Sequence, residues 1–158
     1  MKKIILLIIC VLSTFSALSQ DTNFSVLNGK LVWENVIISQ EINIPAIVAR
    51  HSNLTITGAE GSIYKGKATG LSSSCGNTSK ILKNEYGFNF EIEMSEGKYR
   101  VTITNIVFAG KCGGRAEGFY IDKLQGKRGH ANAGADLTCL DAYFTKLFTM
   151  TRLYKTKS

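Results

Sequence analysis

Histidine is scarce in this chain, and the scarcity argues against a metal site. The 158 residues include only two histidines, His51 and His130. Neither stands three or four positions from another plausible ligand, the helical spacing that metal-binding motifs use. The last three cysteines are 37 and 27 residues apart, and neither interval is a metal-ligand spacing. The sequence therefore predicts no bound metal and no cofactor.

Short motifs for redox and nucleophilic chemistry are missing as well. No Cys-x-x-Cys pair occurs anywhere, and no Gly-x-Ser-x-Gly elbow of the kind that presents a catalytic serine. The small-residue stretch 70–80 superficially resembles a phosphate-binding loop, but it lacks the closing Gly-Lys-Ser/Thr. None of these enzyme classes is indicated by the sequence.

Residues 1–19 have the three parts of a cleavable secretory signal peptide. Met1-Lys2-Lys3 is basic, 4–12 is an unbroken apolar run, and small residues follow up to Ser19. A spanning helix needs about 20 apolar residues, and this run is interrupted too early. Cys10 lies behind bulky isoleucines, so no lipid attachment is expected there. We expect the protein to be exported, periplasmic or secreted, to begin near Gln20, and to keep no membrane span.

The exported part would be one ordinary domain with a modest positive charge. Removing the first 19 residues leaves 139, which is enough to bury a core. Lys2 and Lys3 leave with the signal, so 17 basic and 12 acidic residues give a net charge of +5. Nucleic-acid binding requires a denser basic stripe with stacking aromatics. The expected partner is another protein or a cell-envelope polymer, with an acidic one favoured by charge.

The first part of the domain (20–158) is rich in β-branched and aromatic residues. We expect a strand over 30–38, preceded by a short strand that ends at the turn signal Asn28-Gly29. A short helix then follows, with Asn43 as its N-cap, Pro45 in its first turn and its end near His51.

The middle of the chain predicts antiparallel strands. Two are expected over 54–57 and 62–68, joined across 58–61, and the small polar stretch 70–79 is expected to be a loop. Apolar and polar residues then alternate strictly through two segments separated by a Gly-containing turn, 86–94 and 99–104. Period two on both sides of a turn predicts a hairpin with one buried face.

The end of the chain predicts irregular structure followed by a helix. A Gly-rich stretch over 109–118 passes through Phe119-Tyr120-Ile121 into another Gly/Lys/Arg loop that ends at Gly134. We expect Asp136 to cap a C-terminal helix. Its apolar stripe is expected to comprise Leu140, Phe144, Leu147 and Tyr154.

These elements indicate an α+β domain. We expect an antiparallel sheet with one short helix after the first strand and a C-terminal helix packed on one face. The segment Lys98-Tyr-Arg-Val-Thr-Ile-Thr-Asn-Ile106, with the strand that carries Trp33, resembles a family of exported proteins of Gram-negative bacteria. That family is known only as a domain of unknown function with a TBP-like fold. The resemblance covers about residues 24–107, while the tail 108–158 looks divergent. It implies fold and export, and no activity.

One enzymatic hypothesis uses Cys112 as a nucleophile. Neighbouring Lys111 and Arg115 would favour the thiolate. His130 and Asp136 could then serve as the base and its orienting carboxylate. This hypothesis describes a small envelope hydrolase or thiol enzyme.

The interpretation that we favour makes the same cysteine structural. Export allows disulfides to form, and three remaining cysteines allow one bridge with one thiol left over. Because Cys75 and Cys112 both lie in Gly-rich loops, we expect them to pair and Cys139 to stay reduced on the C-terminal helix.

Binding residues are sought on the polar side of the expected hairpin. Glu91, Glu93 and Arg100 share that side, where cross-strand charge pairing is the expected arrangement. Lys111 and Arg115 are further candidates, because the Gly/Lys/Arg stretch 110–129 would attract an acidic partner. The sequence favours a non-enzymatic binding module of the cell envelope, with the thiol enzyme as the alternative.

Overall fold

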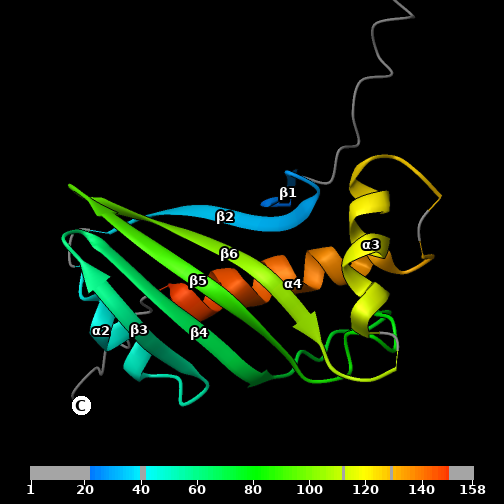
Figure 1. Cartoon of the computed structure of the whole chain (residues 1–158), viewed down its shortest axis with the longest axis horizontal. Helices are drawn as coiled ribbons and strands as arrows, with labels where there is room; N and C mark the ends of the chain where they lie inside the picture. The colour runs from blue at the N-terminus through cyan, green and yellow to red at the C-terminus, as the bar shows by residue number, and fades with distance from the viewer. Residues whose placement is uncertain (1–21, 40–41, 112, 129, 150–158) are drawn as a thin grey trace, which may run out of the picture.

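The computed structural model describes residues 22–39, 42–111, 113–128 and 130–149 of the chain. Within these ranges six strands form one antiparallel sheet in the order β1-β2-β6-β5-β4-β3 (Figure 1). The strands are β1 (Phe24–Leu27), β2 (Lys30–Ile38), β3 (Leu54–Glu60), β4 (Ile63–Leu71), β5 (Tyr86–Ser95) and β6 (Lys98–Phe108). The described helices are α2 (Ile44–Ala49), α3 (Gly113–Leu124) and α4 (Ala133–Phe148). The expected α+β class is confirmed.

The expected hairpin forms the centre of the sheet. Strands β5 and β6 pair in antiparallel register, with Phe90 opposite Ile103 and Glu91 opposite Thr102. Phe90 and Ile103 are buried, whereas Glu91 is exposed. The two faces of the sheet therefore differ as the period-two alternation predicts.

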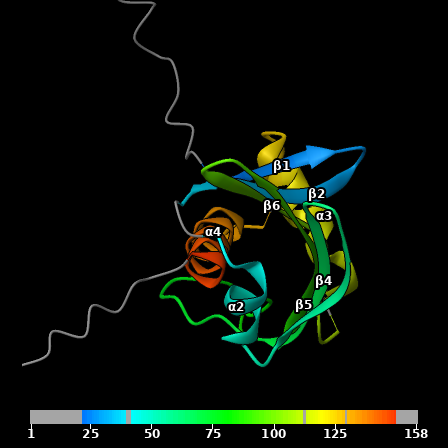
Figure 2. The same ribbon diagram turned by 90° about the vertical axis from the view of Figure 1, so that its left-hand side faces the viewer.

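The sheet curls around α4 (Figure 2). The apolar stripe of α4 lies in this hollow, and the ring of Phe144 is fully buried. Its centroid lies 5.0 Å from that of Phe88 and 5.5 Å from that of Trp33. Leu140 and Leu147 are buried beside it, so three of the four residues expected on the stripe are confirmed. Tyr154 lies outside the described residues.

Helix α2 begins as the sequence predicts. The side chain of Asn43 accepts a hydrogen bond from the Ala46 backbone N–H at 3.0 Å, and Pro45 stands in the first turn. Ile44 and Ile47 are buried in the core, so the helix packs on the inner side of the curled sheet beside α4 (Figure 2).

The connection between β3 and β4 is shorter than the expected one over 58–61. Strand β3 continues to Glu60, with a bulge between Ile56 and Gly58. A bulge lets one strand carry an extra residue while pairing goes on, so Gly58 lies within the strand instead of the turn.

The expected Gly-rich loop after residue 109 is wrong, because residues 113–124 form α3. Tertiary contacts outweigh the low helix propensity of glycine here. Ala116 and Tyr120 are four residues apart on one face, and both are buried. Gly113 packs so close to β6 that an added Cβ would lie 1.8 Å from the carbonyl oxygen of Phe108. At that position glycine is what allows the helix to dock.

The expected helix cap at Asp136 is also wrong. Helix α4 begins at Ala133, with Asn132 in the N-cap position. Asp136 lies inside the helix with 1% of its surface exposed, and its backbone N–H donates to the Asn132 carbonyl at 2.9 Å. Its carboxylate is engaged by groups from other elements, which keep it from capping.

We predict opposite sensitivities for the two faces of β5. The Phe90 ring lies 5.4 Å from that of Phe148 and covers Gly66, so Phe90→Ala removes a buried ring and leaves a cavity. It should lower the free energy of unfolding by about 3–5 kcal/mol. Glu91→Ala, the control next to it, should cost less than about 1 kcal/mol, because its ion pair is exposed. Urea unfolding measures both, and equal losses would contradict a sheet with one buried face.

Candidate functional site

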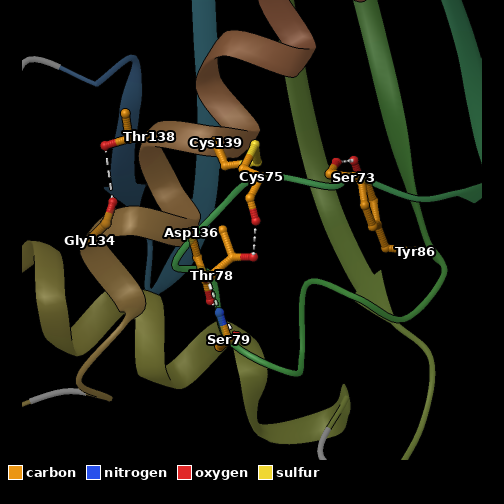
Figure 3. Close-up of a disulfide and its surroundings, with 9 residues drawn as sticks. All are labelled: Ser73, Cys75, Thr78, Ser79, Tyr86, Gly134, Asp136, Thr138 and Cys139. Carbon is orange, nitrogen blue, oxygen red and sulfur yellow. Dashed lines mark hydrogen bonds between the residues drawn. A yellow bond between two sulfur atoms is a disulfide. The ribbon is translucent and has the colours of Figure 1, made fainter.

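The carboxylate of Asp136 joins three parts of the fold. It accepts hydrogen bonds from the Ser79 N–H at 2.7 Å, the Ser79 hydroxyl at 2.5 Å and the Tyr120 hydroxyl at 2.9 Å. Figure 3 shows Ser79 pointing at Asp136 from the loop that precedes β5. Burial, reinforced by the charge of Asp136, raises the pKa of Tyr120 far above its ordinary value. The hydroxyl therefore stays protonated and donates, so this carboxylate has a structural role.

The structure does not bring His130 and Asp136, the proposed base and its orienting carboxylate, together. His130 is exposed. Its Nδ1 accepts from the Asn132 N–H at 3.4 Å, and its ring lies 5.9 Å from that of Phe119. The hydrogen bonds of the Asp136 carboxylate go to Ser79 and Tyr120, so this carboxylate does not orient the imidazole. Cys112, the proposed nucleophile, lies outside the described residues.

The expected disulfide between Cys75 and Cys112 is wrong, because Cys75 pairs with Cys139 (Figure 3). Their Cα atoms are 6.1 Å apart, and 64 residues of sequence separate them. Asp136 lies three residues before Cys139 on α4, so both side chains face the same way. The bonds from Ser79 to Asp136 bring the loop over that side of the helix. Cys139, expected to stay reduced, is therefore brought within reach of Cys75.

A second buried contact fixes the start of the same loop. The hydroxyls of Ser73 and Tyr86 are hydrogen-bonded to each other, and both residues are buried (Figure 3). Burial raises the pKa of Tyr86 far above its ordinary value. The loop from Ser72 to Glu85 is thus tied to the sheet near its start and to α4 through Cys75 and Ser79.

Charge pairing occurs on the outer face of the sheet, where the sequence predicts it. Arg100 lies 3.6 Å from Glu93 and 3.9 Å from Glu34. Lys65 lies 3.5 Å from Glu91. Each pair joins neighbouring strands and is about half exposed, so it contributes little to stability.

The same face is hollowed beside these pairs. A hollow of about 440 Å³ lies over β3, β4, β5 and β6. Two smaller hollows of about 190 and 300 Å³ continue it along β5, because each shares lining residues with the next. We call these three hollows the outer-face groove. Its polar lining includes Thr57, Lys65, Lys67, Asn89, Glu91, Thr102 and Thr104.

The groove includes residues that sequence reasoning did not select. Lys67 and Asn89 each line two of the hollows, and neither was a candidate. The available signal was the spacing Lys65-x-Lys67 in an expected strand, which places both lysines on one face. The same alternation places Asn89 on the face of Glu91 and Glu93.

The remaining binding candidates lie elsewhere. Lys111 is exposed just before α3, and Arg115 is exposed on that helix. Neither lines the outer-face groove. The Gly/Lys/Arg stretch therefore does not add its charge to the hollow in the sheet.

Metal binding finds no support within the described ranges. Among those residues, no three His, Cys, Asp or Glu side chains gather where an ion could bind. His51 lies just after α2, and partial burial together with the nearby charge of Arg50 lowers its pKa. None of the described helices is long and apolar enough to cross a membrane.

Comparison with known proteins gives two distant structural neighbours. A TBP-like protein from Parabacteroides distasonis is 11% identical, with a TM-score of 0.48, over 77% of this chain and 88% of its own. A DUF4468 family protein from Bacteroides ovatus is 13% identical, with a TM-score of 0.45, over 83% and 93%. No protein-family model matches the chain, and no curated protein matches it either. The two names are in keeping with the resemblance stated for residues 24–107. Likeness this distant carries no conclusion about activity, ligand or partner.

We predict that Asp136 is needed for stability. Asp136→Asn replaces an acceptor oxygen with an N–H group that faces the donors of Ser79 and Tyr120. It should lower the free energy of unfolding of the oxidised protein by about 2–3 kcal/mol. The control Asp122→Asn loses only an exposed ion pair with Lys127, and it should cost less than about 1 kcal/mol. If chemical denaturation shows that both variants lose the same small amount of unfolding free energy, Asp136 does not have the structural role described above.

Proposed function

We propose that this chain is an exported, non-enzymatic binding module of the cell envelope. Its outer sheet face receives the partner. The observation that carries the proposal is the contrast between the two faces of the sheet. The inner face is filled by α4, with Phe144 and Trp33 fully buried. The outer face is open and largely polar, apart from the exposed Val36, Ile38 and Val107, and it holds a hollow of about 440 Å³.

Export is supported by two independent features. Residues 1–19 have the composition of a signal peptide. The disulfide between Cys75 and Cys139 is of a kind that persists in oxidising compartments and is rare in the cytosol. Both features fit a protein that works outside the cytoplasm.

Binding fits the groove better than catalysis does. Catalytic sites combine a nucleophile or base with a group that orients it. In the outer-face groove, the carboxylate of Glu91 is paired with Lys65. The groove also contains the hydroxyl groups of Thr102 and Thr104, but no histidine is among its lining residues to act as their base. Such a surface offers many weak polar contacts spread over four strands, as recognition of an extended partner requires.

The proposal is tested by photo-cross-linking in intact cells of a bacterium that encodes the protein. A photoreactive amino acid is placed at Glu91, inside the groove, or at Gln125, an exposed control position after α3. We expect a discrete adduct from position 91 and none from position 125. The recovered protein should begin within a residue or two of Gln20. Adducts only from the control position, or an intact Met1, would contradict the proposed surface or its export.

A further inference from the structure

One line of side chains crosses the outer face from strand to strand. Thr55 of β3 pairs with Lys67 of β4, Lys67 with Asn89 of β5, and Asn89 with Thr104 of β6. We call these four residues the donor row. Each carries a hydrogen-bond donor, and none carries a negative charge. Their positions in the register put them side by side on the exposed face.

The donor row holds an uncompensated positive charge at Lys67. In the part of the chain that the structure describes, no carboxylate lies within ion-pair distance of Lys67. In the next row along the strands Lys65 pairs with Glu91, and in the row after that Arg100 pairs with Glu93 and also contacts Glu34. An anionic group therefore meets an available ammonium at Lys67, with the amide of Asn89 next to it. Hydrogen bonds to charged groups of this kind are the strong ones.

The spacing of the donor row fits one class of extended ligand. Neighbouring strands lie about 4.8 Å apart, so the four side chains span roughly 14 Å. The spacing between neighbouring strands, and not the whole span, is close to the length of one pyranose unit in a sugar chain. An extended peptide instead presents side chains on one face only every second residue, roughly 6.7 Å apart. A linear polysaccharide can therefore place one unit over each strand, and a peptide cannot.

The lining of the groove favours a charged sugar over a neutral one. Neutral sugars bind by stacking their apolar faces on aromatic rings. Among the groove's lining residues, the aromatic rings are those of Tyr86, Phe88 and Phe90, and all three residues are buried. Affinity must then come from ionic and polar contacts. The missing aromatic platform also argues against single-stranded nucleic acid, which relies on base stacking.

Resting on the proposed function, we propose that the partner is a carboxylate-bearing polysaccharide. Its chain lies across the strands on the donor row, with one carboxylate on Lys67. The hydroxyls of the neighbouring sugar units are held by Asn89 and Thr104 on one side and by Thr55 on the other. No bond is made or broken, so the site acts only in recognition.

The test is calorimetric titration of the oxidised protein with trigalacturonate. Maltotriose serves as a neutral trisaccharide and triglutamate as an acidic peptide. We expect trigalacturonate to bind and to bind more weakly as salt is raised, with no binding of maltotriose. Lys67→Gln should weaken trigalacturonate binding about ten- to a hundredfold. Lys98→Gln, which removes an exposed lysine of β6 that does not line the groove, should change it less than about twofold.

Each other outcome decides against the proposal. Equal binding to the wild type and Lys67→Gln, with unchanged thermal unfolding of both, would move the site away from the donor row. Binding of triglutamate alone would make the partner an acidic protein, and binding of maltotriose would make charge irrelevant. If none of the probes binds while position 91 still yields its adduct, the polysaccharide assignment fails and the binding face stands. If the adduct is absent as well, both fail.

Discussion

The packing of α4 against the inner face of the sheet is the contact on which the rest of the structure depends. A sheet with one apolar face must bury it against another layer, and here a single helix fills the curl (Figure 2). Phe144 lies at the centre of this contact, between rings that come from β1, β2 and β5. Because the inner face is filled, the outer face is, among the described residues, the face of the sheet left open to a partner.

Polar contacts decide where α4 sits along the sheet. Asp136 binds Ser79 and Tyr120 near the start of the helix, and one turn further on Cys139 is bridged to Cys75. Asp141 then accepts from the Trp33 indole N–H at 2.6 Å. Hydrophobic packing is non-directional, so these bonds provide the register that packing alone lacks. They also explain why the candidate catalytic carboxylate is unavailable for chemistry.

Local patterns predicted the sheet well and the tail poorly, for physical reasons. The alternation from Tyr86 to Met94 and the cap at Asn43 are decided by near neighbours in sequence, and both are confirmed. Helix α3 depends on Tyr120 reaching Asp136, 16 residues further on, a contact that no local window contains. The disulfide likewise depends on a loop being carried to a helix 64 residues away. Glu91, Glu93 and Arg100 were found by period two, but the importance of Lys67 required the pairing of strands that the sequence does not state.

In this account the partner binds the outer face of the sheet, while the inner face and α4 carry the contacts that hold the fold together. Nuclear magnetic resonance tests this division most directly, by following the backbone amides of the labelled protein as trigalacturonate is added. The account predicts that the largest shift changes fall at Thr55, Lys67, Asn89 and Thr104, while the amides of α4 around Asp136 stay in place. Changes centred on α3 or on the loop from Ser72 to Glu85, with the donor row unmoved, would contradict it.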